Sequence, residues 1–167
     1  FTPLQVGLFC LPFSIALVST APIAGNLAGK YGSRILTTLG PILVSIGLLI
    51  FTTFKLHANI LFIIIAQFLL GMGNGFFQSP TNTAIMNTAS KENRGSASGI
   101  LALFRNAGMI IAVSMAISIF DTLIKIFTSS KINYQNAYIY SYHITLYIGI
   151  IFSLLCSIIS NIAYRKK

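Results

Sequence analysis

The chain has 167 residues, of which 55% are hydrophobic and 8% are charged, and its mean hydropathy is +0.83. Soluble domains carry about 25% charged residues, so this composition excludes an ordinary soluble domain and indicates a membrane protein. The net charge of +9 does not indicate a nucleic-acid-binding protein, because the basic residues lie between long apolar runs rather than on one solvated face.

Five apolar segments are long enough to cross a hydrocarbon core about 30 Å thick, which takes roughly 20 helical residues. Lipid offers the backbone no hydrogen bonds, so uninterrupted apolar runs of this length predict helices. The sequence therefore predicts an all-α integral membrane protein with a single membrane domain over residues 1–167. Its approximate transmembrane helices are residues 4–25, 35–54, 60–80, 97–120 and 144–164. Because Phe1 is not an initiator methionine, we expect a longer protein of which this is a fragment.

The first predicted helix contains Pro12 and Pro22, and the second contains Pro41. Proline removes a backbone donor, but neighbouring helices in a membrane bundle can satisfy the freed carbonyl. We therefore expect kinks at these positions, serving either gating or a purely structural bend.

The connections between the helices, predicted at residues 29–34, 55–59, 87–95 and 128–142, differ in charge. Seven basic residues fall on one side of the membrane: Lys30, Arg34, Lys91, Arg94, Arg165, Lys166 and Lys167. Three fall on the other: Lys55, Lys125 and Lys131. The positive-inside rule predicts that the seven, and with them the C-terminus, are cytoplasmic. We expect a multi-pass protein of the cell (inner or plasma) membrane.

The third predicted helix has a polar face, since its polar and glycine residues follow steps of three and four. These residues are Gln67, Gly71, Asn74, Gln78 and Asn82. An amide facing lipid is costly, so this face should turn towards protein or a watered cavity. Gln67, Asn74 and Gln78 either line a substrate path or form interhelical hydrogen bonds beside close glycine contacts. The pairs Gly71/Gly75 and Gly95/Gly99 have the spacing that lets helix backbones approach closely.

In the fourth predicted helix, Arg105 lies eight residues past Ala97, roughly 12 Å into the hydrocarbon core. Small residues share its helical face, so we expect the charge to point into the bundle. Two roles are open for Arg105. One is structural or conformational, in which it bonds to loop carbonyls or to an acid elsewhere in the protein. The other is direct contact with the substrate or a coupling proton. Asp121 lies at the outer end of the same helix, where we expect its carboxylate to be solvated.

Tyrosines cluster where the last helix enters the membrane: Tyr138, Tyr140, Tyr142 and Tyr147. Amphipathic rings favour that interface, which predicts an anchoring belt rather than a ligand cage. The sequence offers no phosphate-binding glycine loop, no paired carboxylates at depth and no metal-ligand spacing. We therefore expect no enzyme activity, no cofactor and no metal site.

Two stretches resemble the major facilitator superfamily. Residues 25–34, which include Gly25, Lys30, Gly32 and Arg34, resemble the cytoplasmic loop between the second and third helices of each six-helix half. The best form of that loop has an acid where this chain has Gly29. The resemblance implies a conformational role for these loop residues.

The second stretch resembles the C-terminal half of the fourteen-helix drug:proton antiporter branch. It contains Gly71, Gly73, Gly75, Pro80, Asn82, Gly95, Ser98, Gly99, Arg105 and Gly108. Pro3, Leu4, Gln5, Gly7, Pro12 and Pro22 also look like that branch. The resemblance implies a partial major facilitator fold: the five helices correspond to the last five of the transporter, without the first helix of the C-terminal half and without the N-terminal half.

The resemblance further implies multidrug efflux by alternating access, with export of lipophilic or cationic compounds driven by proton entry. The expected partners are the lipid bilayer, a small-molecule substrate, protons and the missing N-terminal half, but no nucleic acid. Two alternatives remain: a facilitator for another solute, such as a siderophore, amino acid or peptide, and a non-transporting membrane assembly or anchoring module.

Overall fold

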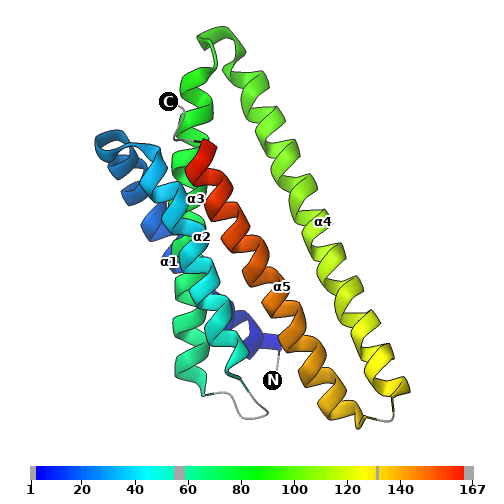
Figure 1. The fold of residues 1–167 in the computed structure, drawn as a ribbon. Coiled ribbons are helices and arrows are strands. Elements are labelled where there is room, and N and C mark those ends of the chain that lie inside the picture. The colour runs from blue at the N-terminus through cyan, green and yellow to red at the C-terminus, as the bar shows by residue number, and fades with distance from the viewer. Residues whose placement is uncertain (1–2, 55–58, 131, 164–167) are drawn as a thin grey trace. The chain divides into compact units, whose positions relative to one another are not determined.

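The computed structural model describes residues 3–54, 59–130 and 132–163. Its long helices are α1 (Pro3–Tyr31), α2 (Ser33–Thr52), α3 (Ile60–Thr88), α4 (Arg94–Ser129) and α5 (Tyr134–Ala163), with a 3₁₀ turn η1 (Lys91–Asn93) before α4 (Figure 1). In the described ranges, five helices are long and apolar enough to cross a membrane. This confirms the predicted all-α, multi-pass membrane fold.

The connection between α1 and α2 is shorter than the predicted residues 29–34. Only Gly32 separates the two helices; its N–H donates to the carbonyl of Ala28 at 3.0 Å, and its φ is +83°. Lys30 and Arg34 are good helix formers, so the chain leaves the helix only where glycine permits a positive φ.

The predicted connection at residues 128–142 is also too long, because α4 continues to Ser129 and α5 already begins at Tyr134. Similarly, α3 passes through Pro80 and ends at Thr88, beyond the predicted limit of its span. Serine, asparagine and tyrosine remain helical outside an apolar run, whereas hydropathy marks only the apolar length.

The limits of the five membrane spans remain predictions, since a helix end does not mark a membrane surface. The second predicted span extends two positions past Thr52, where α2 ends. Residue 164, the predicted end of the last span, and the basic residues Lys55, Lys131, Arg165, Lys166 and Lys167 lie outside the described residues.

The chain forms two compact units, residues 1–84 with 149–167, and residues 85–148. The first unit holds α1, α2, most of α3 and the second half of α5 (Figure 1). The second holds the end of α3, η1, α4 and the first half of α5. The assignment of one membrane domain to residues 1–167 remains a prediction.

Small side chains form the core of the first unit. Ala16, Ala24 and Ala66 are fully buried, whereas large apolar side chains such as Val18, 72% exposed, point outward. Lipid is as apolar as leucine, so membrane helices associate through close packing of small residues rather than through burial of large ones.

Aromatic contacts join α4 to α5 in the second unit. The rings of Phe120 and Tyr138 lie 5.1 Å apart, and those of Phe127 and Tyr140 lie 6.0 Å apart. These pairs lie near the end of α4 and the start of α5. They therefore hold the two helices together beside the short connection that joins them.

Candidate functional site

The helix that carries the predicted polar face, α3, packs closely against α1 through Gly71 and Gly75. A side chain at Gly71 would meet the carbonyl of Phe13 and come within 2.9 Å of the Ala16 side chain. At Gly75 it would meet the hydroxyl of Thr20, which itself donates to the carbonyl of Ala16 at 2.6 Å. Gly71 and Gly75 therefore both lie where α3 approaches α1 closely, and their conformational role remains a prediction.

The opposite side of α3 packs against α2 through Gly73. A β-carbon on Gly73 would lie 2.6 Å from the carbonyl of Gly40, and one on Gly40 would lie 2.6 Å from the carbonyl of Gly73. Farther along α2, a β-carbon on Gly47 would lie 3.0 Å from the Leu70 side chain. The sequence analysis missed this contact, although Gly40 and Gly47 are spaced two helical turns apart and could have indicated it.

The three predicted path residues, Gln67, Asn74 and Gln78, are all half-buried on α3. The Asn74 amide donates to the carbonyl of Leu70 at 2.9 Å, one turn earlier in its own helix. Within the described part of the chain, the side chains of Gln67 and Gln78 form no hydrogen bond. The two glutamines therefore have amide groups left for a ligand, for water or for residues beyond the described ranges.

In the last third of α3, Pro80 is fully buried, while Asn82 is half-buried. Next to Pro80, the Ser79 hydroxyl lies 3.1 Å from where Gly25 of α1 would carry a β-carbon. Gly25 and Ser79 thus extend the α1–α3 contact one helical turn beyond Gly75 along α3.

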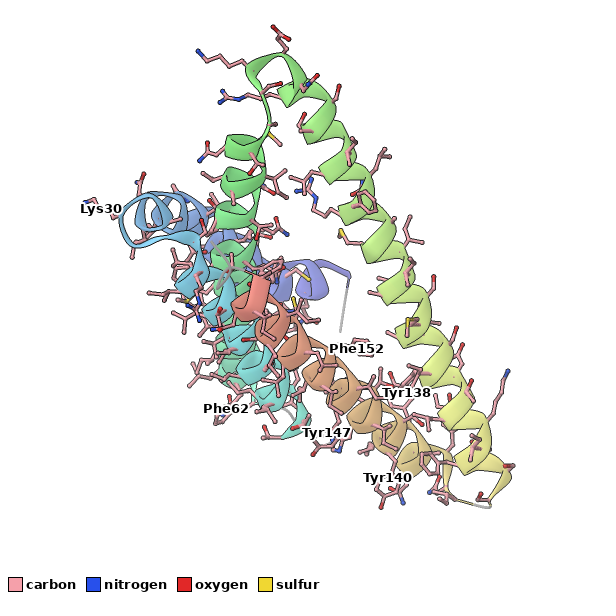
Figure 2. All side chains as sticks on the ribbon, turned by 45° about the horizontal axis from the view of Figure 1, so that its top comes forward. Lys30, Phe62, Tyr138, Tyr140, Tyr147 and Phe152 are labelled. Atoms are coloured by element: carbon pink, nitrogen blue, oxygen red, sulfur yellow. The ribbon has the colours of Figure 1, made fainter. Side chains whose placement is uncertain are left out.

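The basic residues around Gly32 have different surroundings. Figure 2 shows Lys30 at the C-terminal end of α1, where its side chain is exposed. Arg34, on the first turn of α2, donates from Nη2 to Oδ1 of Asn161 on α5 at 2.9 Å. Asn161 is therefore a partner of this loop that the sequence analysis did not find.

The candidate residues of α4 belong to the second unit. Arg105 is exposed and has no hydrogen-bond or ion-pair partner among the described residues. A β-carbon at Gly95, Gly99 or Gly108 would meet no atom within 4 Å. The predicted roles of Arg105 and of these glycines remain predictions.

The tyrosines of α5 lie in its first half, as Figure 2 shows for Tyr138, Tyr140 and Tyr147. All three are about half-exposed, and Tyr138 and Tyr140 contact aromatic rings of α4. The amphipathic side chains thus stay accessible on the outside of the helix pair. The anchoring belt remains the interpretation that we favour.

Across the described ranges, no three His, Cys, Asp or Glu side chains gather where they could hold a metal ion. Cys10 and Cys156 are free thiols.

Comparison with protein families identifies the chain. The family model described as Major Facilitator Superfamily matches residues 1–166. The chain belongs to the major facilitator superfamily. Together with its five apolar helices, this membership points to a part of a membrane transporter rather than to an enzyme.

The curated relatives include one protein named for multidrug resistance and two named as transporters. The chain is 31% identical over 115 residues to the multidrug resistance protein Stp of Mycobacterium tuberculosis, a match that covers 69% of this chain and 21% of Stp. It is 34% identical over 104 residues to the uncharacterized transporter YebQ of Escherichia coli, covering 62% and 23%. It is 26% identical over 119 residues to the riboflavin transporter RibZ of Clostridioides difficile, covering 71% and 26%. The chain thus spans about a quarter of the length of these relatives.

Proposed function

We propose that this chain forms part of a secondary transporter that exports drugs or other lipophilic and cationic compounds by alternating access. The single observation that carries this proposal is the polar face of α3. Gln67 and Gln78 place half-buried amides in this membrane-spanning helix, and their side chains form no hydrogen bond to the described residues. Such groups are costly against lipid and are found where a helix lines a polar path or meets protein.

The glycine contacts support a conformational role for the helices around that face. Gly71 and Gly75 against α1, and Gly73 against α2, bring three helix backbones close together. A packed set of helices can move as one body, which alternating access around a midplane site requires. We assign Gly25, Lys30, Gly32, Arg34, Pro80, Asn82, Gly95, Gly99, Arg105 and Gly108 to this conformational machinery.

The proposed mechanism needs a second half, with the substrate site between the two. We also propose that proton entry drives export and that the coupling carboxylates lie outside this chain. Its two acidic residues, Glu92 and Asp121, are both exposed, and Glu92 lies in the η1 turn. The excess of basic residues around Gly32 and η1 favours a cytoplasmic location for this side and for the C-terminus, in the inner or plasma membrane.

Expression of the gene with its native flanking sequence, in a bacterium that lacks its main efflux pumps, tests the proposal. We expect lower accumulation of a lipophilic cation such as ethidium and a higher inhibitory concentration of that compound. Unchanged accumulation at verified membrane expression would contradict drug export.

A second candidate is transport of a different solute, which the similarity to the riboflavin transporter RibZ favours. The same cells, when made unable to synthesise riboflavin, distinguish the candidates. Growth on low external riboflavin, without any change in ethidium accumulation, would support the second candidate and exclude the first.

A further inference from the structure

A row of side-chain contacts joins α5 to α2 within the first unit. Gly149 lies beside Leu48, whose side chain would be 3.5 Å from a β-carbon on that glycine. One turn farther along α5, Ser153 Oγ donates to the carbonyl of Pro41 at 2.7 Å. A turn beyond that, Ser157 Oγ donates to the carbonyl of Thr38 at 3.0 Å. The Arg34–Asn161 bond described above completes the row.

The contacts recur every four residues on α5, so they occupy one face of that helix. Residue numbers rise along α5 as they fall along α2, so the two helices run antiparallel. Figure 1 shows α2 and the second half of α5 next to each other in the first unit. We call Arg34, Ser153, Ser157 and Asn161 the α2–α5 clasp.

The two serines of the clasp act on the part of α2 that proline weakens. Pro41 is buried inside α2, has no N–H to donate to the carbonyl one turn earlier, and crowds the carbonyls nearby. The carbonyls that accept from α5 belong to Pro41 itself and to Thr38, three residues before it. Ser157 is 5% exposed, so its hydroxyl has little access to water and depends on this acceptor.

We propose that Ser153 and Ser157 are positioning residues that bond α5 to the backbone of α2 at Pro41 and Thr38 and thereby keep α2 and α5 in fixed register during transport. The inference rests on the proposed function, because only alternating access requires α2 and α5 to move together. It assigns no substrate contact to either serine. Serine hydroxyls that form hydrogen bonds between helices are common in membrane proteins.

Removal of both serine hydroxyl groups in the complete transporter tests whether they hold this register. We expect Ser153→Ala with Ser157→Ala to lower the maximal export rate roughly five- to tenfold, with the half-saturating substrate concentration unchanged. An unchanged maximal rate, or a shift in the half-saturating concentration alone, would overturn the proposal.

The matched control is Ser129→Ala with Ser130→Ala. Both of these serines are exposed and donate to the Ile126 carbonyl within α4, at 2.7 and 3.0 Å. The control also removes two serine hydroxyl groups, but it leaves the contacts of α2 unchanged. It should export at the unmodified rate, and a loss as large as that of the clasp variant would overturn the assignment.

A cross-link separates the clasp from the proposed function. Leu48→Cys and Gly149→Cys, in a background with Cys10→Ala and Cys156→Ala, place two thiols at the contact beyond the serines. A bifunctional thiol reagent with a short spacer should join the fragments produced at a protease site inserted after α3, and gel electrophoresis detects the product without any transport assay. We expect efficient cross-linking and continued export by the cross-linked protein.

Failure to cross-link would overturn the α2–α5 contact, whatever the protein transports. Cross-linking that stops export would overturn the fixed register. A cross-linked parent protein that exports none of the compounds offered would leave the contact standing and contradict the proposed function instead.

Discussion

At Gly71 the backbones of α3 and α1 approach so closely that a methyl group would overlap the Phe13 carbonyl. We therefore predict that Gly71→Ala destabilises the complete transporter by about 1–3 kcal/mol, the usual cost of overpacking. Gly29→Ala is the matched control, because Gly29 is exposed in α1 and has open space around its β-position. Thermal unfolding in detergent, followed by a thiol-reactive dye, measures both. Equal unfolding temperatures for the two variants would contradict the close contact.

We propose that Arg105 is paired in the complete transporter, and that the partner is not a carboxylate of this chain. The sequence has two acids, Glu92 and Asp121. At about 1.5 Å of rise per residue, each lies roughly 20 Å or more from Arg105 along the helix axis. An acid that pairs with Arg105 must therefore come from outside this chain.

We predict that Arg105→Ala lowers export by the complete protein at least tenfold, since an Arg in a span costs about 2.5–3.5 kcal/mol unless its partners compensate. Lys125→Ala on the same helix, where Lys125 is exposed, should leave export nearly unchanged. Ethidium efflux at matched expression compares the two variants. Equal rates would remove Arg105 from the transport machinery.

At the scale of single elements, the three amide side chains of α3 differ in whether they are free to contact a substrate, and this difference can be tested. Asn74 already donates to the Leu70 carbonyl, whereas Gln67 and Gln78 form no hydrogen bond within the described ranges. Gln78→Leu should therefore raise the half-saturating concentration of a cationic substrate several-fold, and Asn74→Leu should change it less. Initial efflux rates over a range of ethidium concentrations provide the comparison. The reverse order would show that Asn74, not Gln78, is directed towards the path.

The helices themselves could be predicted from the sequence, because an apolar run of roughly 20 residues has few alternatives in lipid. Their ends could not. The polar residues after Phe120 continue α4 to Ser129, and the basic segment around Lys30 is helical up to Gly32. Hydropathy indicates which residues are apolar enough to lie in lipid. It does not indicate where the backbone stops being helical.

The candidate site was predictable to the same partial extent. The spacing of Gly71 and Gly75 indicated a close helix contact, and the structure provides it on α1. The contacts of Gly73 with α2 and of Ser157 with Thr38 join residues far apart in the chain. Periodicity within one helix shows which residues share a face but not which helix that face meets. The sequence analysis therefore missed α5 as the partner of α2.

At the scale of the whole molecule, the family of the chain and the greater length of its relatives indicate which part of the transport mechanism it supplies. It belongs to the major facilitator superfamily over residues 1–166, and its match covers 21% of Stp and 26% of RibZ. Alternating access requires two repeats around one site. We therefore propose that residues 1–167 supply conformational elements and one polar helix face, while the coupling acids and the other wall of the site come from the rest of the protein.

Proton-coupled export by the complete protein, compared with the 167-residue chain alone, tests this account most directly. Each is reconstituted into liposomes with an imposed pH gradient, and a fluorescent pH indicator records the response to an added lipophilic cation. We predict that the cation dissipates the gradient with the complete protein and leaves it unchanged with the 167-residue chain. Coupled dissipation by residues 1–167 alone, or none by the complete protein, would contradict the account.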